Sequence, residues 1–526
     1  MVTYKIGKNS LENLTTAMYD DTKFIYREYI QNAADQIDKA ISLGMFEDFH
    51  PVIDIKIDVH KRNIIIKDNA TGIKADEVIT KLATIADSDK DREKDKGFRG
   101  IGRLGGIGYC ETLRFVTSYQ GETIKTIMSW DAAKCIELID DRDVRDSAAE
   151  ILEKIITIKT EPCSAEEHFF IVELLNIRKD NTELLDIDAV KSYIASNAPV
   201  PFNNKFIYCG KINEFARKTY QPLHEYKVQV KGDDILKEYS TNIYEMVGNQ
   251  RKKCDDIYDI EFQEFRNKKG ELLGWLWFGV SAYEKQIQAS VNPMRGLRLR
   301  KQNIQIGNSE TLERFFKEQR GNGYYIGEVH AVHKDLIPNA RRDYFKENVT
   351  RNEFEAELKA FFREKLHNLY VDANKIKNVY KKQNDYNQTR DAYQQKLKDG
   401  FVNQKEETQY EEATEAAKKN AEKAMRELEN LKNKNASNET FKRVFEIIAK
   451  KHEVKRPLVK DDIPKIFKDE KEEKKNGKTV YVTDNLYRLD NKQRKLVSRI
   501  YGVLNDNLPP KIAEEIIKKI QDELNK

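Results

Sequence analysis

The order of apolar and polar residues predicts alternating helices and strands over the first part of the chain. Apolar residues recur every three or four positions between residues 22 and 43, which predicts an amphipathic helix. Short runs rich in β-branched and aromatic residues predict strands. These runs cover residues 52–59, 63–68, 113–119, 123–130 and 169–177. The pattern therefore predicts an α+β layer at this end of the chain.

A second mixed region follows from about residue 186, and helical patterns alone follow from about residue 351. The strand-like runs of this second region cover residues 271–283, 296–307 and 324–332. Residues 411–436 are rich in Ala, Glu, Lys and Leu and have almost no β-branched residues, which is typical of a long exposed helix or coiled coil. We expect a helical hairpin, or a coiled coil with a partner, rather than a freestanding rod.

The length of 526 residues exceeds what one compact core supports, and the patterns divide the chain into four expected domains. Residues 1–185 and residues 186–350 are two α+β domains. Residues 351–436 are long helices with a coiled coil, and residues 437–526 are a helical domain that ends in two amphipathic helices around a Pro-Pro turn. The expected fold class is α+β, followed by an all-α C-terminal region.

Composition argues against several classes of protein. Charged residues make up 34% of the chain and hydrophobic residues 39%, but the net charge is only +4, so no global nucleic-acid footprint is present. Five scattered cysteines without a C-x-x-C pair argue against a disulfide framework and against a zinc module. The start lacks the apolar core of a signal peptide, and the best apolar run, residues 272–280, is about half a membrane span. We expect a cytoplasmic protein without a membrane anchor.

Three polar residues share one narrow face of the first predicted helix. Glu28, Asn32 and Asp35 lie at positions i, i+4 and i+7. The opposite face carries an apolar stripe suited to burial, made of Tyr26, Ile30, Ala33, Ala34, Ile37 and Ile41. Taken alone, the polar face is most simply a solvated surface. The alternative is a binding site built on this face, and that choice depends on chemistry elsewhere in the chain.

Two downstream segments supply such chemistry. Residues 64–73 form an apolar strand that ends in Asp68 and runs into a turn at Gly72. Residues 97–108 contain six glycines, which permit positive φ angles and let backbone N–H groups converge on an anion. Two other motif matches fail. GIGRLG at 100–105 does not follow an apolar strand, as a dinucleotide fingerprint requires, and GKT at 477–479 lacks the preceding glycine of a P-loop.

The order of these segments resembles the GHKL ATPases, the superfamily of gyrase B, Hsp90, histidine kinases and MutL. REYIQNAADQID (27–38) is similar to the N-box of Hsp90-type members, DNATGI (68–73) to the D-x-G-x-G box, and GFRGIG (97–102) to the G-x-x-G-x-G box. The resemblance covers about residues 10–350. It implies a GHKL (Bergerat) α/β sandwich with ATP and Mg²⁺ as ligands, then a transducer-like second domain. The coiled coil after these two domains is similar to the MORC arrangement.

The resemblance also implies roles for individual residues. Glu28 is expected to be the general base that orients or deprotonates the attacking water, and Asn32 to supply an oxygen ligand to Mg²⁺. Asp35 would support the pocket floor, Asp68 would accept a hydrogen bond from the adenine amino group, and Gly72 would let the base approach the backbone. The residues expected to bind the phosphates are Gly97, Phe98, Arg99, Gly100, Ile101 and Gly102.

The second domain is expected to contribute a catalytic arginine. DLIPNARRDYF (335–345) resembles the Hsp90 middle-domain segment that carries it, and the corresponding residue is Arg342, whose planar fork suits a phosphate. The alternative for Arg342 is a plain ion pair with Asp343 or another neighbour.

The sequence departs from the family pattern at two points within the expected ATP domain. Ala70 replaces the first glycine of its box, a small-for-small change. EEHFFIVELLN (166–176) lacks the threonine that many members place near the adenine, which affects nucleotide affinity and selectivity. Residues 80–100 are expected to form an ATP lid.

The leading hypothesis is an ATPase whose ATP-bound N-terminal domains dimerise, so that ATP acts as a conformational clamp. A histidine kinase would need a phosphoacceptor His on helices before the ATP domain. A type II topoisomerase or a MutL-type endonuclease would need a further metal-binding domain, which the Lys/Glu-rich tail does not offer.

The clamp would act on a protein client, as in a chaperone, or with an effector or DNA, as in a MORC-like or bacterial antiphage-defence protein. The basic stretch 295–301 is a candidate for DNA contacts, but alternating Arg and Leu is more typical of a half-exposed sheet edge.

Overall fold

The computed structural model describes the chain except for residues 1–5, 16–20, 46–49, 85–101, 453–482 and 484–485. The chain divides into two compact units. Unit 1 comprises Met1–Ser281 and Lys285–His367, and unit 2 comprises Ala282–Glu284 and Asn368–Lys526.

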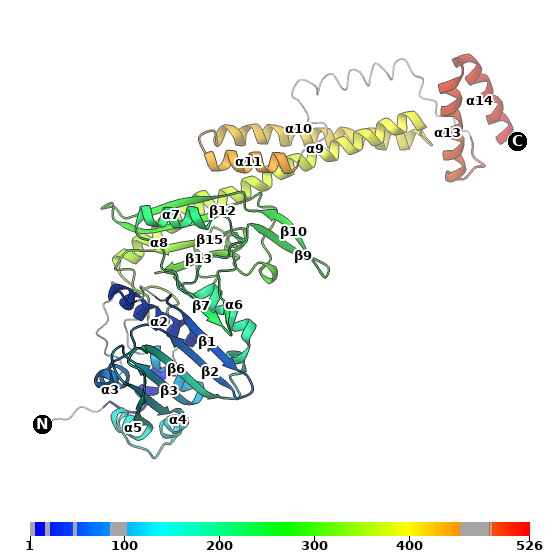
Figure 1. The fold of residues 1–526 in the computed structure, drawn as a ribbon. Coiled ribbons are helices and arrows are strands. Elements are labelled where there is room, and N and C mark those ends of the chain that lie inside the picture. The colour runs from blue at the N-terminus through cyan, green and yellow to red at the C-terminus, as the bar shows by residue number, and fades with distance from the viewer. Residues whose placement is uncertain (1–5, 16–20, 46–49, 85–101, 453–482, 484–485) are drawn as a thin grey trace. The chain divides into compact units, whose positions relative to one another are not determined.

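The first layer of unit 1 is an eight-stranded sheet with the order β5-β4-β3-β6-β2-β1-β7-β8 (Figure 1). Neighbouring strands are antiparallel except for β1 and β7, which are parallel. The strands are β1 (Ile53–Asp58), β2 (Asn63–Asp68), β3 (Cys110–Ser118), β4 (Ile124–Asp131), β5 (Ile156–Pro162), β6 (Phe169–Ile177), β7 (Val228–Val230) and β8 (Asp233–Asp234).

The sequence pattern predicts β1, β2, β3, β4 and β6 because each has a buried face and therefore a clear apolar signal. It does not predict β5, which lies at the edge of the sheet with nearly every residue exposed. The sheet also continues through β7 and β8, past residue 185 where we place the domain boundary, because β7 pairs with β1 across the intervening chain.

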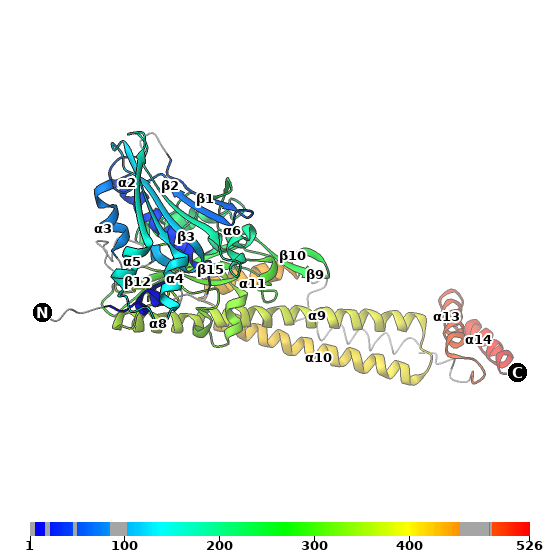
Figure 2. The same ribbon diagram turned by 90° about the horizontal axis from the view of Figure 1, so that it is seen from below.

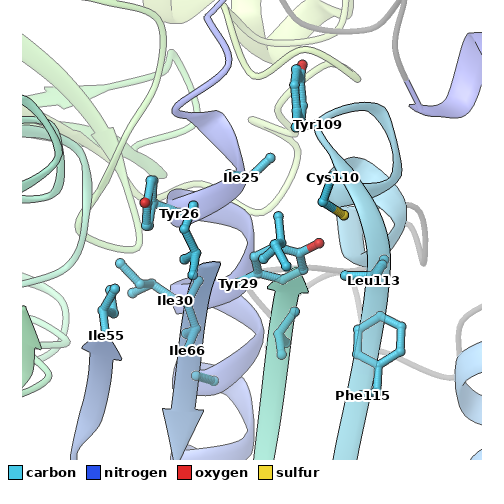
Figure 3. Close-up of a cluster of buried hydrophobic side chains, with 14 of the residues drawn as sticks. Ile25, Tyr26, Tyr29, Ile30, Ile55, Ile66, Tyr109, Cys110, Leu113 and Phe115 are labelled. Atoms are coloured by element: carbon cyan, nitrogen blue, oxygen red, sulfur yellow. The ribbon is translucent and has the colours of Figure 1, made fainter. Parts of the chain in front are cut away.

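The core of this layer forms where helix α2 (Phe24–Ser42) packs on the sheet. Figure 3 shows Tyr29 and Ile30 of α2 among side chains of the strands that include Ile66 and Phe115, and all four are buried. The predicted apolar stripe is confirmed from Tyr26 to Ile37, whereas Ile41, near the end of the helix, is 54% exposed.

The remaining helices of this layer are short. They are α1 (Asn9–Thr15), α3 (Val78–Ala83), α4 (Ala132–Asp140), α5 (Ala148–Ile155) and α6 (Ile187–Asn197), with the 3₁₀ helices η1 (Ala75–Glu77), η2 (Gly102–Gly108) and η3 (Thr182–Leu185).

The second layer of unit 1 is a five-stranded sheet with the order β11-β12-β15-β13-β14 and a separate β9–β10 hairpin. The strands are β9 (Asn242–Val247), β10 (Gln250–Asp256), β11 (Asp259–Arg266), β12 (Leu272–Val280), β13 (Gly296–Lys301), β14 (Ile304–Gln305) and β15 (Ile326–Ala331). The helical elements are α7 (Cys209–Thr219), α8 (Val349–Phe361), η4 (Ala289–Val291), η5 (Glu313–Phe315), η6 (Gln319–Tyr324) and the π-helical turn η7 (Phe362–Leu366).

Two predictions for residues 295–307 are wrong. The single predicted strand is the hairpin β13–β14, because Gln302 and Asn303 adopt positive φ angles of 51° and 62° and turn the chain. The basic stretch is not a half-exposed edge either, since β13 lies between β15 and β14. Arg298 and Arg300 are buried, and Arg300 forms an ion pair with the buried Glu328.

Unit 2 is helical. Helices α9 (His367–Asp399) and α10 (Gln404–Lys434) lie side by side in both views (Figures 1 and 2), and Tyr386 of α9 packs on Ala421 of α10. The predicted helical hairpin is therefore confirmed. The unit also contains α11 (Glu439–Lys451), α13 (Asn491–Asn507) and α14 (Pro510–Leu524).

The last two helices form the predicted pair around the Pro-Pro turn, where Pro509 and Pro510 start α14 and Tyr501 packs on Ile517. None of the helices in the described ranges is long and apolar enough to cross a membrane.

Candidate functional site

A cavity of about 950 Å³ lies on the polar face of α2 within unit 1. The first sheet contributes apolar side chains to the cavity lining, which include Ile66, Phe115, Phe170 and Val172. The rings of Phe115 and Phe170 are stacked with centroids 5.8 Å apart. A flat apolar slot with polar groups along one side is the usual form of a small-molecule site.

The polar face of α2 is directed into this site rather than into bulk solvent. Asn32 and Asp35 line the cavity, and Asp35 is only 5% exposed. Glu28 is 7% exposed and does not contribute to the cavity lining in the described part of the chain. It lies against Gly102, where an added Cβ would come within 2.4 Å of Glu28 Oε2. The interpretation of this face as an ordinary solvated surface therefore does not hold.

Two arginine side chains form ion pairs with the Glu28 carboxylate. Arg27 Nη2 lies 3.2 Å from Glu28 Oε1, and Arg342 Nε lies 3.7 Å from the same oxygen. The tertiary structure thus places Arg342 next to Glu28, although the two residues are distant in the sequence. Asp343, the alternative partner for Arg342, accepts a hydrogen bond from the Asn339 side chain.

The loop that carries Arg342 holds it in an unusual backbone conformation. Arg342 has a φ of +56°, a left-handed value that non-glycine residues seldom adopt. A bridge between Pro338 and Phe345 closes the loop, and Gly307 N donates to the Arg342 carbonyl at 2.8 Å. Backbone strain of this kind persists where the surrounding structure fixes it, and it is common at functional sites.

Asp68 marks the opposite end of the site, where β2 ends. Its side chain is 3% exposed, lines the cavity and accepts a hydrogen bond from Ala70 N at 3.0 Å. Gly72 follows with a φ of +67°, and an added Cβ would lie 1.9 Å from the Ser118 carbonyl oxygen. Only glycine fits there, so the turn brings the backbone directly against the strand.

Thr117 of β3 places its hydroxyl group beside the turn at Gly72. Thr117 Oγ1 accepts a hydrogen bond from Ile73 N at 2.8 Å and donates to the Phe169 carbonyl at 3.0 Å. His168, just before β6, donates from Nδ1 to the Ala70 carbonyl at 2.7 Å. The sequence carries no signal for these contacts, because they depend on pairing between distant strands.

The glycine cluster lies partly outside the described residues and partly in η2, against α2. Five of the residues expected to bind phosphate, Gly97, Phe98, Arg99, Gly100 and Ile101, lie outside the described residues, and the same holds for most of the expected lid. Gly105 and Gly106 permit close packing on α2, because an added Cβ would come within 2.8 Å of the Phe24 ring and 2.6 Å of Tyr29 Oη. These two glycines therefore serve helix packing rather than anion binding.

The family comparison agrees with this geometry. Residues 23–162 match the family model described as histidine kinase-, DNA gyrase B-, and HSP90-like ATPase. Residues 23–162 form a GHKL-family ATPase domain. The matched range contains Glu28 and the cavity residues Asn32, Asp35, Asp68 and Gly72.

Relatives of the GHKL domain include chaperones. The chaperone protein HtpG of Campylobacter jejuni (strain RM1221) is 37% identical over 84 residues, which are 15% of this chain and 14% of that protein. HtpG of Frankia casuarinae is 29% identical over 157 residues (26% and 24%), and HtpG of Francisella tularensis subsp. novicida is 24% identical over 266 residues (47% and 37%). The aligned parts cover well under half of these chaperones.

The second layer also contributes residues to the cavity lining, and none of them is assigned to the nucleotide site from the sequence. Lys301, Gln302 and Asn303 line the cavity from the β13–β14 turn, and His330 lines it from β15. Asn303 Nδ2 donates to the His224 carbonyl at 2.7 Å, and Lys237 Nζ donates to Asn303 Oδ1 at 2.7 Å. This wall is therefore held by buried polar contacts, which no local pattern reveals.

Burial shifts the pKa values of two groups in this wall. It lowers the pKa of Lys301 to about 8 and the pKa of His330 to about 4. His330 is therefore neutral at pH 7, and its ring stacks on Trp275 with centroids 4.2 Å apart.

The donor set of the GHKL domain fits ATP with Mg²⁺. Asp68 is a buried acceptor in the cavity lining, Gly72 permits close backbone approach, and the Asn32 side chain offers an oxygen of the kind that Mg²⁺ prefers. No group of three metal-binding side chains occurs among the described residues. A Mg²⁺ ion that takes most of its ligands from phosphates and water needs only one or two protein oxygens.

The pKa of Asp68 predicts how adenosine binding depends on pH. Burial raises this pKa to about 7, so the carboxyl is largely protonated at pH 6 and largely ionised at pH 8. If the adenine amino group donates to the ionised carboxylate, as the resemblance to the family implies, binding should tighten roughly tenfold between these pH values. Calorimetry with adenosine, which has no titrating phosphate, measures the change. Asp68→Asn should remove the dependence, and a pH-independent affinity of the unchanged protein would contradict the assignment.

Proposed function

We propose that this chain binds ATP in the cavity on α2 and hydrolyses it to ADP and phosphate. The observation that carries the proposal is the position of Glu28. Its carboxylate is buried, shares a helix face with the cavity residues Asn32 and Asp35, and contacts Arg342 from the second layer. A carboxylate and an arginine brought together at a nucleotide site can act on the attacking water and on the terminal phosphate.

Each residue has a chemical task in this proposal. Glu28 orients or deprotonates the attacking water as general base, and Arg342 stabilises the charge that develops on the terminal phosphate. Asn32 ligates Mg²⁺ and Asp35 supports the pocket floor. Asp68 accepts a hydrogen bond from the adenine amino group.

The glycines complete the proposed nucleotide site. Gly72 allows a close backbone approach in the cavity, and Gly102 leaves room for the Glu28 carboxylate. Residues Gly97 to Ile101 are proposed to wrap the phosphates, as the family motif implies.

We further propose that ATP gates dimerisation of two chains and so acts as a clamp. The chaperone names of the relatives support a protein client as the target. The second candidate is an effector or DNA in an antiphage-defence system. The stretch 295–301 gives this candidate little support, because Arg298 and Arg300 are buried.

The ATPase rate per chain, measured against protein concentration, tests the clamp. Dimer gating predicts a rate per chain that rises with concentration and then levels off. Parallel series contain duplex DNA at two salt concentrations or an unfolded protein. Stimulation by the unfolded protein alone supports the client, whereas stimulation by DNA that fades at high salt supports the DNA role. A constant rate per chain would exclude gating by dimerisation.

A further inference from the structure

Arg103 is a cavity residue for which neither the sequence motifs nor the proposed mechanism has a role. It follows Gly102 in η2, and its side chain lines the cavity. Its backbone is fixed against α2, since Tyr29 Oη donates to the Arg103 carbonyl at 3.1 Å and accepts from Gly106 N at 3.1 Å. Gly102 itself touches Glu28. Arg103 therefore lies toward the Glu28 end of the site, where the phosphates are expected.

The guanidinium group of Arg103 is only partly satisfied by the protein. Nη2 donates to the carbonyl of Thr84, which terminates α3. Nε is buried and has no hydrogen-bond partner, and none of the ion pairs formed between described residues involves Arg103. Nε is enclosed by the protein, so the outer nitrogens of the guanidinium are the groups that a ligand in the cavity would contact.

The charge of this group persists at neutral pH. Burial lowers the pKa of Arg103 from its usual value, but a guanidinium stays protonated at pH 7. The described part of the site thus contains a cation that faces a cavity and has no carboxylate paired with it. The ligand that compensates it must be an anion with oxygens spaced for a planar fork, and a phosphate group meets that requirement.

We propose that Arg103 binds the phosphate chain of the nucleotide and makes the site selective for nucleotides over nucleosides. This inference rests on the proposed function and adds a binding residue to it. The hydrogen bond to Thr84 keeps the guanidinium in place before the ligand arrives, so little side-chain entropy is lost on binding. Arg103 also joins the end of α3 to the start of η2.

Binding of ATP, ADP and adenosine to full-length variants tests the proposal. Arg103→Gln should weaken ATP and ADP binding about tenfold to a hundredfold and leave adenosine binding unchanged within about twofold. Arg103→Lys keeps the charge but loses the fork, so its affinities should lie between those of Arg103→Gln and the unchanged protein. Calorimetry gives the three dissociation constants for each variant.

Arg114→Gln is the matched control. Arg114 lies on β3 of the same layer and carries the same charge, but it is not part of the cavity lining, and its Nε forms an ion pair with Glu173. Its loss should change ATP affinity less than about threefold, because a paired arginine outside the cavity contributes little.

The outcomes separate this inference from the proposed function. Adenosine and ATP binding that weaken equally in Arg103→Gln would show a purely structural role and overturn the inference, as would unchanged ATP binding. Thermal unfolding of each variant identifies a general loss of fold. If the unchanged protein binds neither ATP nor ADP, the proposed function itself fails.

Discussion

Replacing Glu28 by glutamine should lower the rate of ATP hydrolysis roughly 10²- to 10⁴-fold while ATP binding stays within about threefold. Glutamine keeps the shape of the side chain but cannot accept a proton from water. Binding should persist because the adenine and phosphate contacts come from other residues. Hydrolysis is followed as phosphate release at saturating ATP, and binding is followed by calorimetry.

A second carboxylate on α2 serves as the control for Glu28. Asp38 also lines the cavity, but its Oδ1 accepts a hydrogen bond from the Tyr226 hydroxyl at 2.6 Å. Asp38→Asn should therefore change the hydrolysis rate less than about tenfold. Normal hydrolysis by Glu28→Gln would refute the assignment of Glu28 as the base, and an equal loss in both variants would indicate a general electrostatic effect.

The second large effect is expected for Arg342→Ala, which should lower the catalytic rate about 10²-fold or more at saturating ATP. Arg342 reaches Glu28 on a closed loop with a left-handed backbone, so its position is fixed by the fold. ATP affinity should change less than the rate, because the proposed contact stabilises the transition state rather than the bound nucleotide. Single-turnover kinetics separate the two effects.

The neighbouring arginine is a close control for this substitution. Arg341 is exposed and precedes Arg342 directly, so Arg341→Ala removes the same charge from the same loop. Its catalytic rate should stay within about twofold. A loss shared by both variants, or a normal rate in Arg342→Ala, would contradict the catalytic role. Arg342 would then only form an ion pair, which is the alternative that the sequence also permits.

The proposed site takes its parts from both layers of unit 1, and this arrangement bears on regulation. The proposed base, Glu28, and the proposed adenine contact, Asp68, lie in the GHKL domain, whereas Arg342 and the β13–β14 turn belong to the second layer. Any ligand that changes how these layers pack would change the distance between Glu28 and Arg342. The chain could in this way couple ATP turnover to events at its second layer.

The sequence by itself determined the features that depend on local spacing. The polar face of α2 follows from helical periodicity, and β1, β2 and β6 follow from runs of buried apolar residues. The turn after Asp68 follows from the glycine at position 72, which comes shortly after the apolar strand. These signals lie within a few residues of one another, so a single segment contains all the information.

Only the tertiary structure decided which of these features meet. The contact between Arg342 and Glu28, the packing role of Gly105 and Gly106, and the cavity position of Arg103 all depend on segments that are distant in the chain. The burial of Arg298 and Arg300 likewise depends on β13 lying between two other strands. Periodicity reports which face of an element is buried, but the identity of the neighbour follows from the packing of the whole unit.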